Sequence, residues 1–348
     1  MRKILVVLTG GTIGSKIEGS VINVTEASPF DLLDLYKETY GSGCTFEVIQ
    51  PFTLLSENMN LQYYSQLARV MWELPYKECA GVIVTHGSDT LSYTAALLGM
   101  LLRHVPVPVV LIAANYPLGD KRSNGLANFK SAVDLIRGYL LRGVYCVYRS
   151  NKGENNVYLG TRMTEADAYL DQFGSFGGVP LGMMEEGSLC YNGGVPNPTL
   201  PQIRDRRSPI VSDCPVFEKT VLMVRSYPGL DYRSIDLGRK PAAVVCYLYH
   251  SATGCTQGEG TSILDFIDRC HEEGIPVYAA SAKIAAKKSY VTAKAIRERG
   301  VILLGHISPE AAYAKVLLLH NIGTNEDAKR RIKDTIFFEN LPFPEDLI

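Results

Sequence analysis

Short apolar runs alternate with amphipathic stretches through the first part of the chain. The runs with the length of buried strands are 4–8, 81–85, 107–113 and 144–147. The stretches with amphipathic character, which indicate helices, are 61–74, 91–103 and 124–141. Strand and helix in alternation predict a large three-layer α/β domain with a mostly parallel sheet.

A turn-forming and charged segment interrupts this pattern at 191–215, where N-G-G-V-P-N-P is followed by R-D-R-R-S-P. We interpret it as a linker between a large domain at 1–190 and a small domain at 216–348. Beyond it the alternation resumes on a smaller scale, at 220–225, 242–248, 262–273, 276–279, 290–299, 301–304 and 308–320. The sequence therefore predicts a second, smaller α/β domain.

Composition excludes several classes of protein. The 348 residues include 35 Lys and Arg against 36 Asp and Glu, whereas a dedicated nucleic-acid binder is strongly basic. The eight cysteines form no C-x-x-C pair and the six histidines no H-E-x-x-H, so we predict no metal and no cofactor. No apolar stretch reaches the roughly 18 residues of a membrane span. We expect a cytoplasmic protein with reduced thiols and no nucleic-acid or membrane partner.

The segment T-G-G-T-I-G at 9–14 directly follows the first predicted strand. It therefore lies at the carboxyl end of a parallel sheet, where open α/β folds bind their ligands. Its glycines do not fit the dinucleotide pattern G-x-G-x-x-G. A glycine-rich loop that carries Thr12 suits a hydroxyl nucleophile, and a plain turn between strand and loop is the alternative.

Two further segments carry polar residues after predicted strands. T-H-G-S-D-T at 85–90 precedes a helical stretch, so its hydroxyl or carboxylate groups could simply cap that helix. The functional alternative places Ser88 and Asp89 in the same crevice as Thr12. S-E-N-M at 56–59 opens another helical stretch, where Ser56 is either a turn or cap residue or the ligand of a substrate carboxylate.

Taken together, these segments resemble the bacterial-type asparaginase/glutaminase family. T-G-G-T-I at 9–13 is similar to its first signature, T-H-G-S-D-T at 85–90 to its second, and S-E-N-M to the segment between them. Order and spacing match along nearly the whole chain. Further likenesses lie at 113–117, 180–182, 227–231 and 311–319.

The resemblance implies a fold and a mechanism. It implies large and small α/β domains, homodimers or homotetramers, and a small-molecule amino-acid amide as substrate. Thr12 would attack the side-chain amide carbon, ammonia would leave as an acyl-enzyme forms, and water would release the acid. Ser88 and Asp89 would be its catalytic partners, with backbone N–H groups near Ser88 stabilising the oxyanion. The implied substrate-binding residues are Gly11, Ser56, Glu57, Gly87 and Ala114.

The sequence departs from the family at several positions. Ser88 replaces the usual threonine of the second signature and keeps its hydroxyl group. Our alignment puts Thr164 where the family has an essential lysine, and Val21 where it has a tyrosine that activates the nucleophile. Tyr116 replaces the arginine of G-A-M-R-P, and the segment 249–254 differs from the usual G-x-G-N.

These departures leave three hypotheses. The first is an asparaginase-type amidohydrolase, with Lys121, Arg162 or Tyr116 near Ser88 or Asp89 in place of the lysine. The second is a non-catalytic relative that binds an amino acid or a peptide amide in the same crevice. The third, a subunit that amidates a charged tRNA, is disfavoured by the neutral charge and by the lack of an appended domain.

Overall fold

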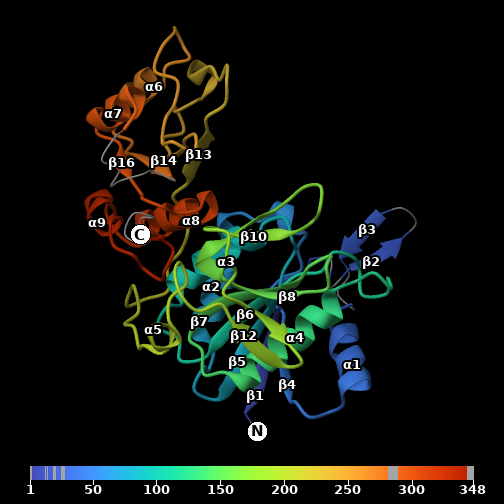
Figure 1. Ribbon diagram of the computed structural model, residues 1–348. Helices are drawn as coiled ribbons and strands as arrows, with labels where there is room; N and C mark the ends of the chain where they lie inside the picture. The colour runs from blue at the N-terminus through green and yellow to red at the C-terminus, as the bar shows by residue number, and fades with distance from the viewer. Residues whose placement is uncertain are drawn as a thin grey trace. The chain divides into compact units, whose positions relative to one another are not determined.

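The computed structural model describes residues 2–11, 13, 15–18, 21–24, 28–280 and 289–342. The chain divides into two compact units, Met1–Cys214 and Pro215–Ile348 (Figure 1). Most of the segment 191–215, predicted as a linker, belongs to the first unit. It contains a short helix, α5 (Leu200–Arg204), whose Ile203 side chain is fully buried.

The first unit is built on an eight-stranded sheet in the order β12-β11-β8-β7-β6-β5-β1-β4. Five neighbouring strands are parallel: β4 (Phe46–Ile49), β1 (Lys3–Leu8), β5 (Cys79–Thr85), β6 (Pro108–Ile112) and β7 (Gly143–Arg149). Three strands extend one edge in antiparallel fashion: β8 (Asn155–Leu159), β11 (Gly182–Glu185) and β12 (Ser188–Tyr191). The predicted mixed α/β class with a mostly parallel sheet is confirmed.

Helices pack on this sheet because their apolar residues face it. α4 (Gly125–Gly138) packs against β5, β6 and β7 and contacts α1 (Ser28–Tyr40). α3 (Leu91–Leu101) packs against β7, and every residue of it except Tyr93 is buried. The remaining elements are α2 (Leu61–Glu73), η2 (Ser56–Asn58), η3 (Gly160–Arg162) and the hairpins β2 (Ser15–Glu18) with β3 (Val21–Val24) and β9 (Met163–Ala166) with β10 (Phe173–Ser175).

The second unit has a four-stranded parallel sheet. Its strands, in spatial order, are β13 (Val221–Arg225), β14 (Ala243–Tyr247), β15 (Val277–Ala280) and β16 (Ile302–Leu303). Its helices are η4 (Tyr232–Ser234), α6 (Ile263–Glu272), α7 (Val291–Glu298), α8 (Pro309–Asn321) and α9 (Asn325–Arg331). Each apolar stretch predicted beyond residue 216 coincides with one of these elements to within two residues.

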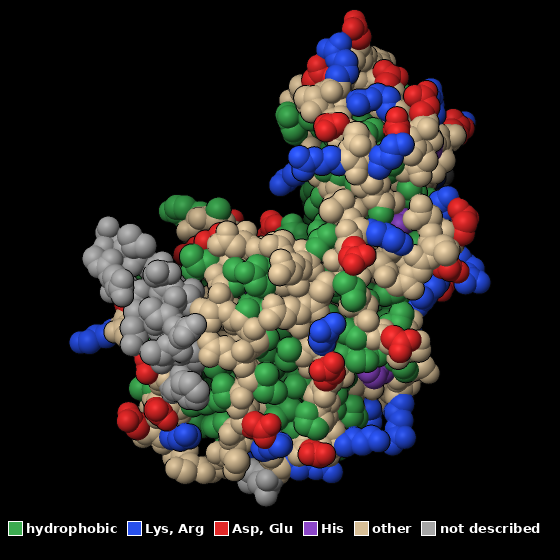
Figure 2. All heavy atoms as spheres, turned by 180° about the vertical axis from the view of Figure 1, so that it is seen from behind, with side chains coloured by type: hydrophobic (Ala, Val, Ile, Leu, Met, Phe, Trp, Pro, Cys, Tyr) green, Lys and Arg blue, Asp and Glu red, His purple; other side chains and the backbone are tan. Residues whose placement is uncertain are grey.

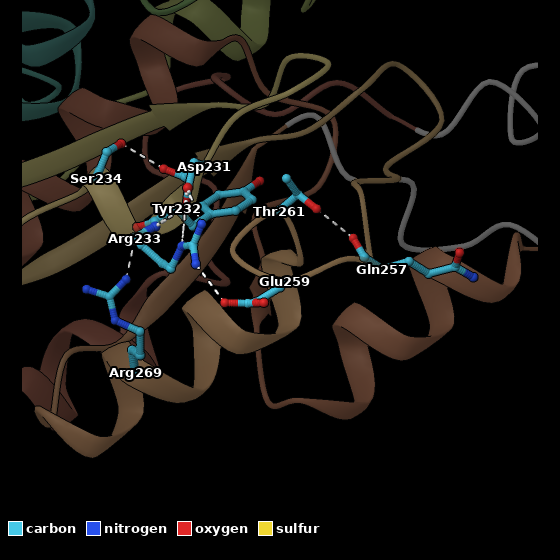
Figure 3. A network of polar contacts seen from close by, with 8 residues as sticks. All are labelled: Asp231, Tyr232, Arg233, Ser234, Gln257, Glu259, Thr261 and Arg269. Atoms are coloured by element: carbon cyan, nitrogen blue, oxygen red, sulfur yellow. Dashed lines mark hydrogen bonds and ion pairs between the residues drawn. The ribbon is translucent and has the colours of Figure 1, made fainter.

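An arginine network holds the loop that follows β13 (Figure 3). Arg233 forms ion pairs with Asp231 at 2.7 Å and with Glu259 at 2.9 Å. Arg269 of α6 donates to the backbone carbonyl oxygens of Tyr232 at 2.9 Å and Ile235 at 3.1 Å. Arg233 therefore fixes η4 to the segment before α6, and Arg269 fixes it to α6 itself.

Figure 2 shows acidic and basic side chains close to one another on the face that it displays, together with gathered hydrophobic side chains, in keeping with the balanced composition. Among the described residues, no helix combines the length and the apolar character needed to cross a membrane. Nor does that part of the chain hold three or more His, Cys, Asp or Glu side chains placed to bind a metal ion.

Candidate active site

Two of the predicted segments leave the same edge of the large sheet. β1 and β5 are parallel neighbours, with Leu8 opposite Thr85, so residues 9–13 and 86–90 follow at adjacent strand ends. The hydroxyl group of Thr9 donates to the carbonyl oxygen of Thr85 at 2.7 Å. Thr12 itself lies outside the described residues.

The third segment joins them through backbone hydrogen bonds. Leu54 N–H donates to the carbonyl of Thr9 at 3.0 Å, and Gly11 N–H donates to the carbonyl of Leu54 at 3.1 Å. This short parallel bridge brings η2, and with it Ser56 and Glu57, to the carboxyl edge of the sheet.

Glycine is required where the three segments meet. Gly11 has a φ of +81°, and a Cβ there would lie 2.4 Å from the backbone nitrogen of Gly87. A Cβ on Gly87 would lie 2.3 Å from the Oγ of Ser56, far inside van der Waals contact. Three predicted site residues, Gly11, Gly87 and Ser56, are therefore stacked on one another, and any side chain at either glycine would separate them.

The helix-cap alternatives for these segments are wrong. Thr90 is the N-cap of α3, yet no side chain caps that helix; its hydroxyl donates instead to the carbonyl of Ser56 at 2.9 Å. α2 is capped by Asn60, not Ser56. Ser88 is half-buried and Asp89 is exposed, which leaves both side chains available at this edge.

Asp89 and Glu57 form a carboxyl pair. Partial burial of the Asp89 carboxyl group is the main cause that raises its pKa. The negative charge of Glu57 and hydrogen bonding with Glu57 raise the pKa of Asp89 further. The raised pKa favours the protonated form of Asp89, whereas a cation bound beside it would favour the ionised form.

His86 orients the backbone beside Ser88. Its ring is buried, with Nδ1 2.8 Å from the carbonyl oxygen of Gly87 and Nε2 3.0 Å from the hydroxyl of Thr94. Burial lowers the pKa of His86 to about 4, so the ring is neutral at pH 7. A carbonyl can only accept, so Nδ1 carries the hydrogen and Nε2 accepts from Thr94.

The orientation of the Gly87 carbonyl also sets the direction of the Ser88 N–H, which is a candidate donor to the oxyanion. In a trans peptide the C=O and the following N–H point in opposite directions. Because His86 holds the Gly87 carbonyl toward the core, the N–H of Ser88 points away from it. Sequence reasoning assigned no role to His86; its place in the second signature, directly after a buried strand, is the signal that could have found it.

Ala114 follows β6 and is buried. Asn128 donates its side-chain amide to the carbonyl of Ala113 at 2.8 Å, and the side chain of Asn124 accepts from Asn115 N–H at 3.0 Å. A Cβ on Gly125 would lie 3.1 Å from the Cβ of Ala114 and 3.2 Å from Ile13. The first residues of α4 therefore place Ala114 beside the loop that carries Thr12.

Two of the three candidate replacements for the lysine, Arg162 and Tyr116, have other partners. Arg162 is buried and donates to the carbonyl of Pro196 at 2.7 Å. The guanidinium carbon of Arg122 lies 4.0 Å from the centroid of the Tyr116 ring.

Thr164, at the position of the family lysine, lies in β9 opposite Gly174, and Val21, at the position of the family tyrosine, lies in β3. Within the described residues, neither Ser88 nor Asp89 contacts Lys121 or any other lysine, arginine, histidine or tyrosine through a hydrogen bond or ion pair.

A parallel sheet with hydroxyl and carboxyl residues gathered at its carboxyl edge defines an α/β protein of the asparaginase class, and residues 3–196 match the family model "Asparaginase, N-terminal". The chain belongs to the asparaginase family. This membership supports an amidohydrolase-like enzyme.

Two of the curated relatives that this chain matches are subunits of an amidotransferase. A glutamyl-tRNA(Gln) amidotransferase subunit of Metallosphaera sedula is 27% identical over 94% of this chain and 74% of its own length. The corresponding subunit of Pyrococcus horikoshii is 26% identical over 98% of this chain and 77% of its own length.

Two solved asparaginases share the fold. The thermostable L-asparaginase of Thermococcus kodakarensis superposes with a TM-score of 0.80 at 23% identity, covering 97% of this chain and 99% of its own. L-asparaginase I of Vibrio cholerae superposes with a TM-score of 0.77 at 21% identity, covering 98% and 99%.

Proposed function

We propose that the protein is an asparaginase-type amidohydrolase that releases ammonia from the side-chain amide of asparagine or a related amide. Thr12 is the nucleophile, Ser88 and Asp89 are its partners, and Gly11, Ser56, Glu57, Gly87 and Ala114 bind the substrate. The observation that carries the proposal is the stack of Gly11, Gly87 and Ser56, because it brings both signatures to one sheet edge.

Each part of the edge has a role in this reaction. The Ser88 N–H, aimed away from the core by His86, stabilises the oxyanion that forms when Thr12 attacks. Asp89 and Glu57 bind the substrate's ammonium group, and Ser56 binds its carboxylate.

The test is ammonia release from L-Asn, D-Asn, L-Gln and short Asn-containing peptides. We expect release that disappears in Thr12→Ala and falls strongly in Ser88→Ala. No release above the Thr12→Ala background on any substrate, from folded protein, would overturn the proposal. Saturable binding of L-Asn without release would then establish the alternative, a non-catalytic protein that binds an amino acid or a peptide amide.

A second candidate rests on the names of the curated relatives. If this chain acts as an amidotransferase subunit as they do, its amide donor is glutamine, and the ammonia passes to an acceptor. The ratio of kcat/KM for L-Gln to that for L-Asn separates the candidates. A ratio above one favours the amidotransferase subunit, and a ratio below one favours the asparaginase.

We further propose that the protein is cytoplasmic and forms homodimers or homotetramers. Its substrate is a small-molecule amino-acid amide. Light scattering of the purified protein tests the assembly. A monomer at micromolar concentration would contradict it.

A further inference from the structure

A cavity lies at the opposite end of the large sheet from the proposed active site. It has a volume of about 430 Å³ and opens where β1, β5 and β6 begin. The last turn of α4 and the loop to β7 close its other side. This volume is within the range of sites that bind small organic molecules.

The cavity combines an apolar wall with cationic groups. Its apolar side chains are Ile4, Val107, Ile136, Leu140 and Leu141, with two prolines beside them. Four of these five are buried, whereas Leu140 is 84% exposed at the rim. An apolar side chain this exposed next to a cavity is free to cover the apolar part of a ligand.

Two arginines, Arg2 and Arg137, line the same cavity. Among the described residues neither forms an ion pair, although the neighbouring Lys3 is paired with Glu47 at 2.6 Å. The hydrogen bond that Arg137 makes is to the thiol of Cys44, at 3.5 Å, a weak acceptor. Among the described residues, no carboxylate forms a direct ion pair with either arginine of the cavity.

We propose that this cavity binds a small amphipathic organic anion, with its carboxylate or phosphate on Arg2 and Arg137 and its apolar body against Ile4, Ile136 and Leu140. Arginine suits such a head group because its planar fork can donate two parallel hydrogen bonds. An apolar body is needed because an inorganic anion would leave the wall of the cavity uncovered. The site is separate from the amide-hydrolysing edge, so its test needs no amide substrate.

The test is calorimetric titration of the purified full chain with four probes: octanoate, octyl phosphate, octanol and inorganic phosphate. We expect saturable 1:1 binding of octanoate or octyl phosphate, at least tenfold weaker in Arg2→Gln and in Arg137→Gln. Whichever amphiphile binds more tightly identifies the head group. Octanol and inorganic phosphate should each bind at least tenfold more weakly than that amphiphile.

Arg206→Gln is the matched control, since Arg206 is an exposed arginine of the same unit that does not line the cavity. Its affinity should equal that of the unchanged protein. Equal binding by all three variants, octanol binding as tightly as octanoate, or no saturable binding of either amphiphile would overturn the proposal. Thermal melts of each variant confirm that a lost affinity is not lost folding.

Discussion

Two pairs of carboxylates, one in each unit, differ in what lies between them. Asp231 and Glu259 share the guanidinium of Arg233, at 2.7 and 2.9 Å (Figure 3). Among the described residues, Glu57 and Asp89 have only each other. The hydrogen bonds of Arg233 lower the pKa of Asp231, whereas burial and Glu57 raise the pKa of Asp89.

The difference separates a structural role from a binding one. An arginine between two carboxylates offsets the charge of one of them and fixes a loop, so it already occupies the place that a cationic group would take. A carboxyl pair without a cation is unfavourable when both groups are ionised, and an ammonium group that enters between them relieves the repulsion. We therefore propose that the Arg233 network serves the folding of the small unit, whereas the Glu57–Asp89 pair binds the substrate.

The largest effect should come from Asp89→Asn. This change keeps the shape of the side chain but removes the charge that binds the substrate's ammonium group. We expect kcat/KM for the preferred amide to fall about 100-fold or more, because the ammonium group of the bound substrate loses its charged hydrogen-bond partner. The matched control is Asp231→Asn, which should leave kcat/KM within about threefold. Equal losses in both variants would refute the division between the two pairs.

The next effect concerns two buried histidines. His86→Phe leaves the Gly87 carbonyl without its donor, and His320→Phe removes bonds to Tyr278 and Asn325 in the small unit. Each should lower the free energy of unfolding by about 1–3 kcal/mol, the cost of an unpaired buried polar group. Only His86→Phe should also lower kcat, by about tenfold or more, because the Ser88 N–H loses its orientation. Denaturant melts and steady-state kinetics measure the two effects; an unchanged kcat in folded His86→Phe would contradict the positioning role.

The third effect is a shift in pH dependence. Asp89 must be ionised to bind an ammonium group, so the raised pKa of Asp89 limits activity on the acid side. Glu57→Gln removes the neighbouring negative charge and lowers the pKa of Asp89. The acid limb of the kcat/KM profile should therefore move to lower pH. In the control, Glu259→Gln, the acid limb of the kcat/KM profile should not move. If the acid limb does not move in Glu57→Gln either, the pKa of Asp89 does not determine it.

Much of the fold and part of the candidate site could be predicted from local sequence. The apolar run at 107–113 contains β6 (Pro108–Ile112). A short apolar run between turn residues is typical of a buried strand, so this element was predictable. The meeting of 9–13 with 85–90 at one edge also followed from sequence, since parallel strands end at the same side. The helix α5 was missed although its signal was readable, because Thr199 and Gln202 form a capping box beside Pro201.

The remaining contacts depend on the path of loops. Thr90 and Ser56 are 34 residues apart, and their hydrogen bond requires the bridge between Gly10 and Leu54. The pairing of Glu57 with Asp89 follows from that bridge as well. A helix cap was the simpler prediction for Thr90 because capping needs only neighbours in sequence. The hydroxyl group of Thr90 instead donates to the carbonyl of Ser56, which is distant in sequence.

The smallest effect should come from Arg233→Gln, because its ion pairs are exposed and exposed pairs contribute little to stability. The folded pKa of Asp231 is lowered, so its stabilising contribution is present above the unfolded pKa and is lost as pH falls through the folded value. Arg233→Gln should therefore lower the melting temperature slightly at pH 7, less in high salt, and not at all at a pH below both values. Its kcat/KM should match that of the unchanged protein. A large loss of activity would place the Arg233 network in the working site and remove the contrast with Glu57 and Asp89.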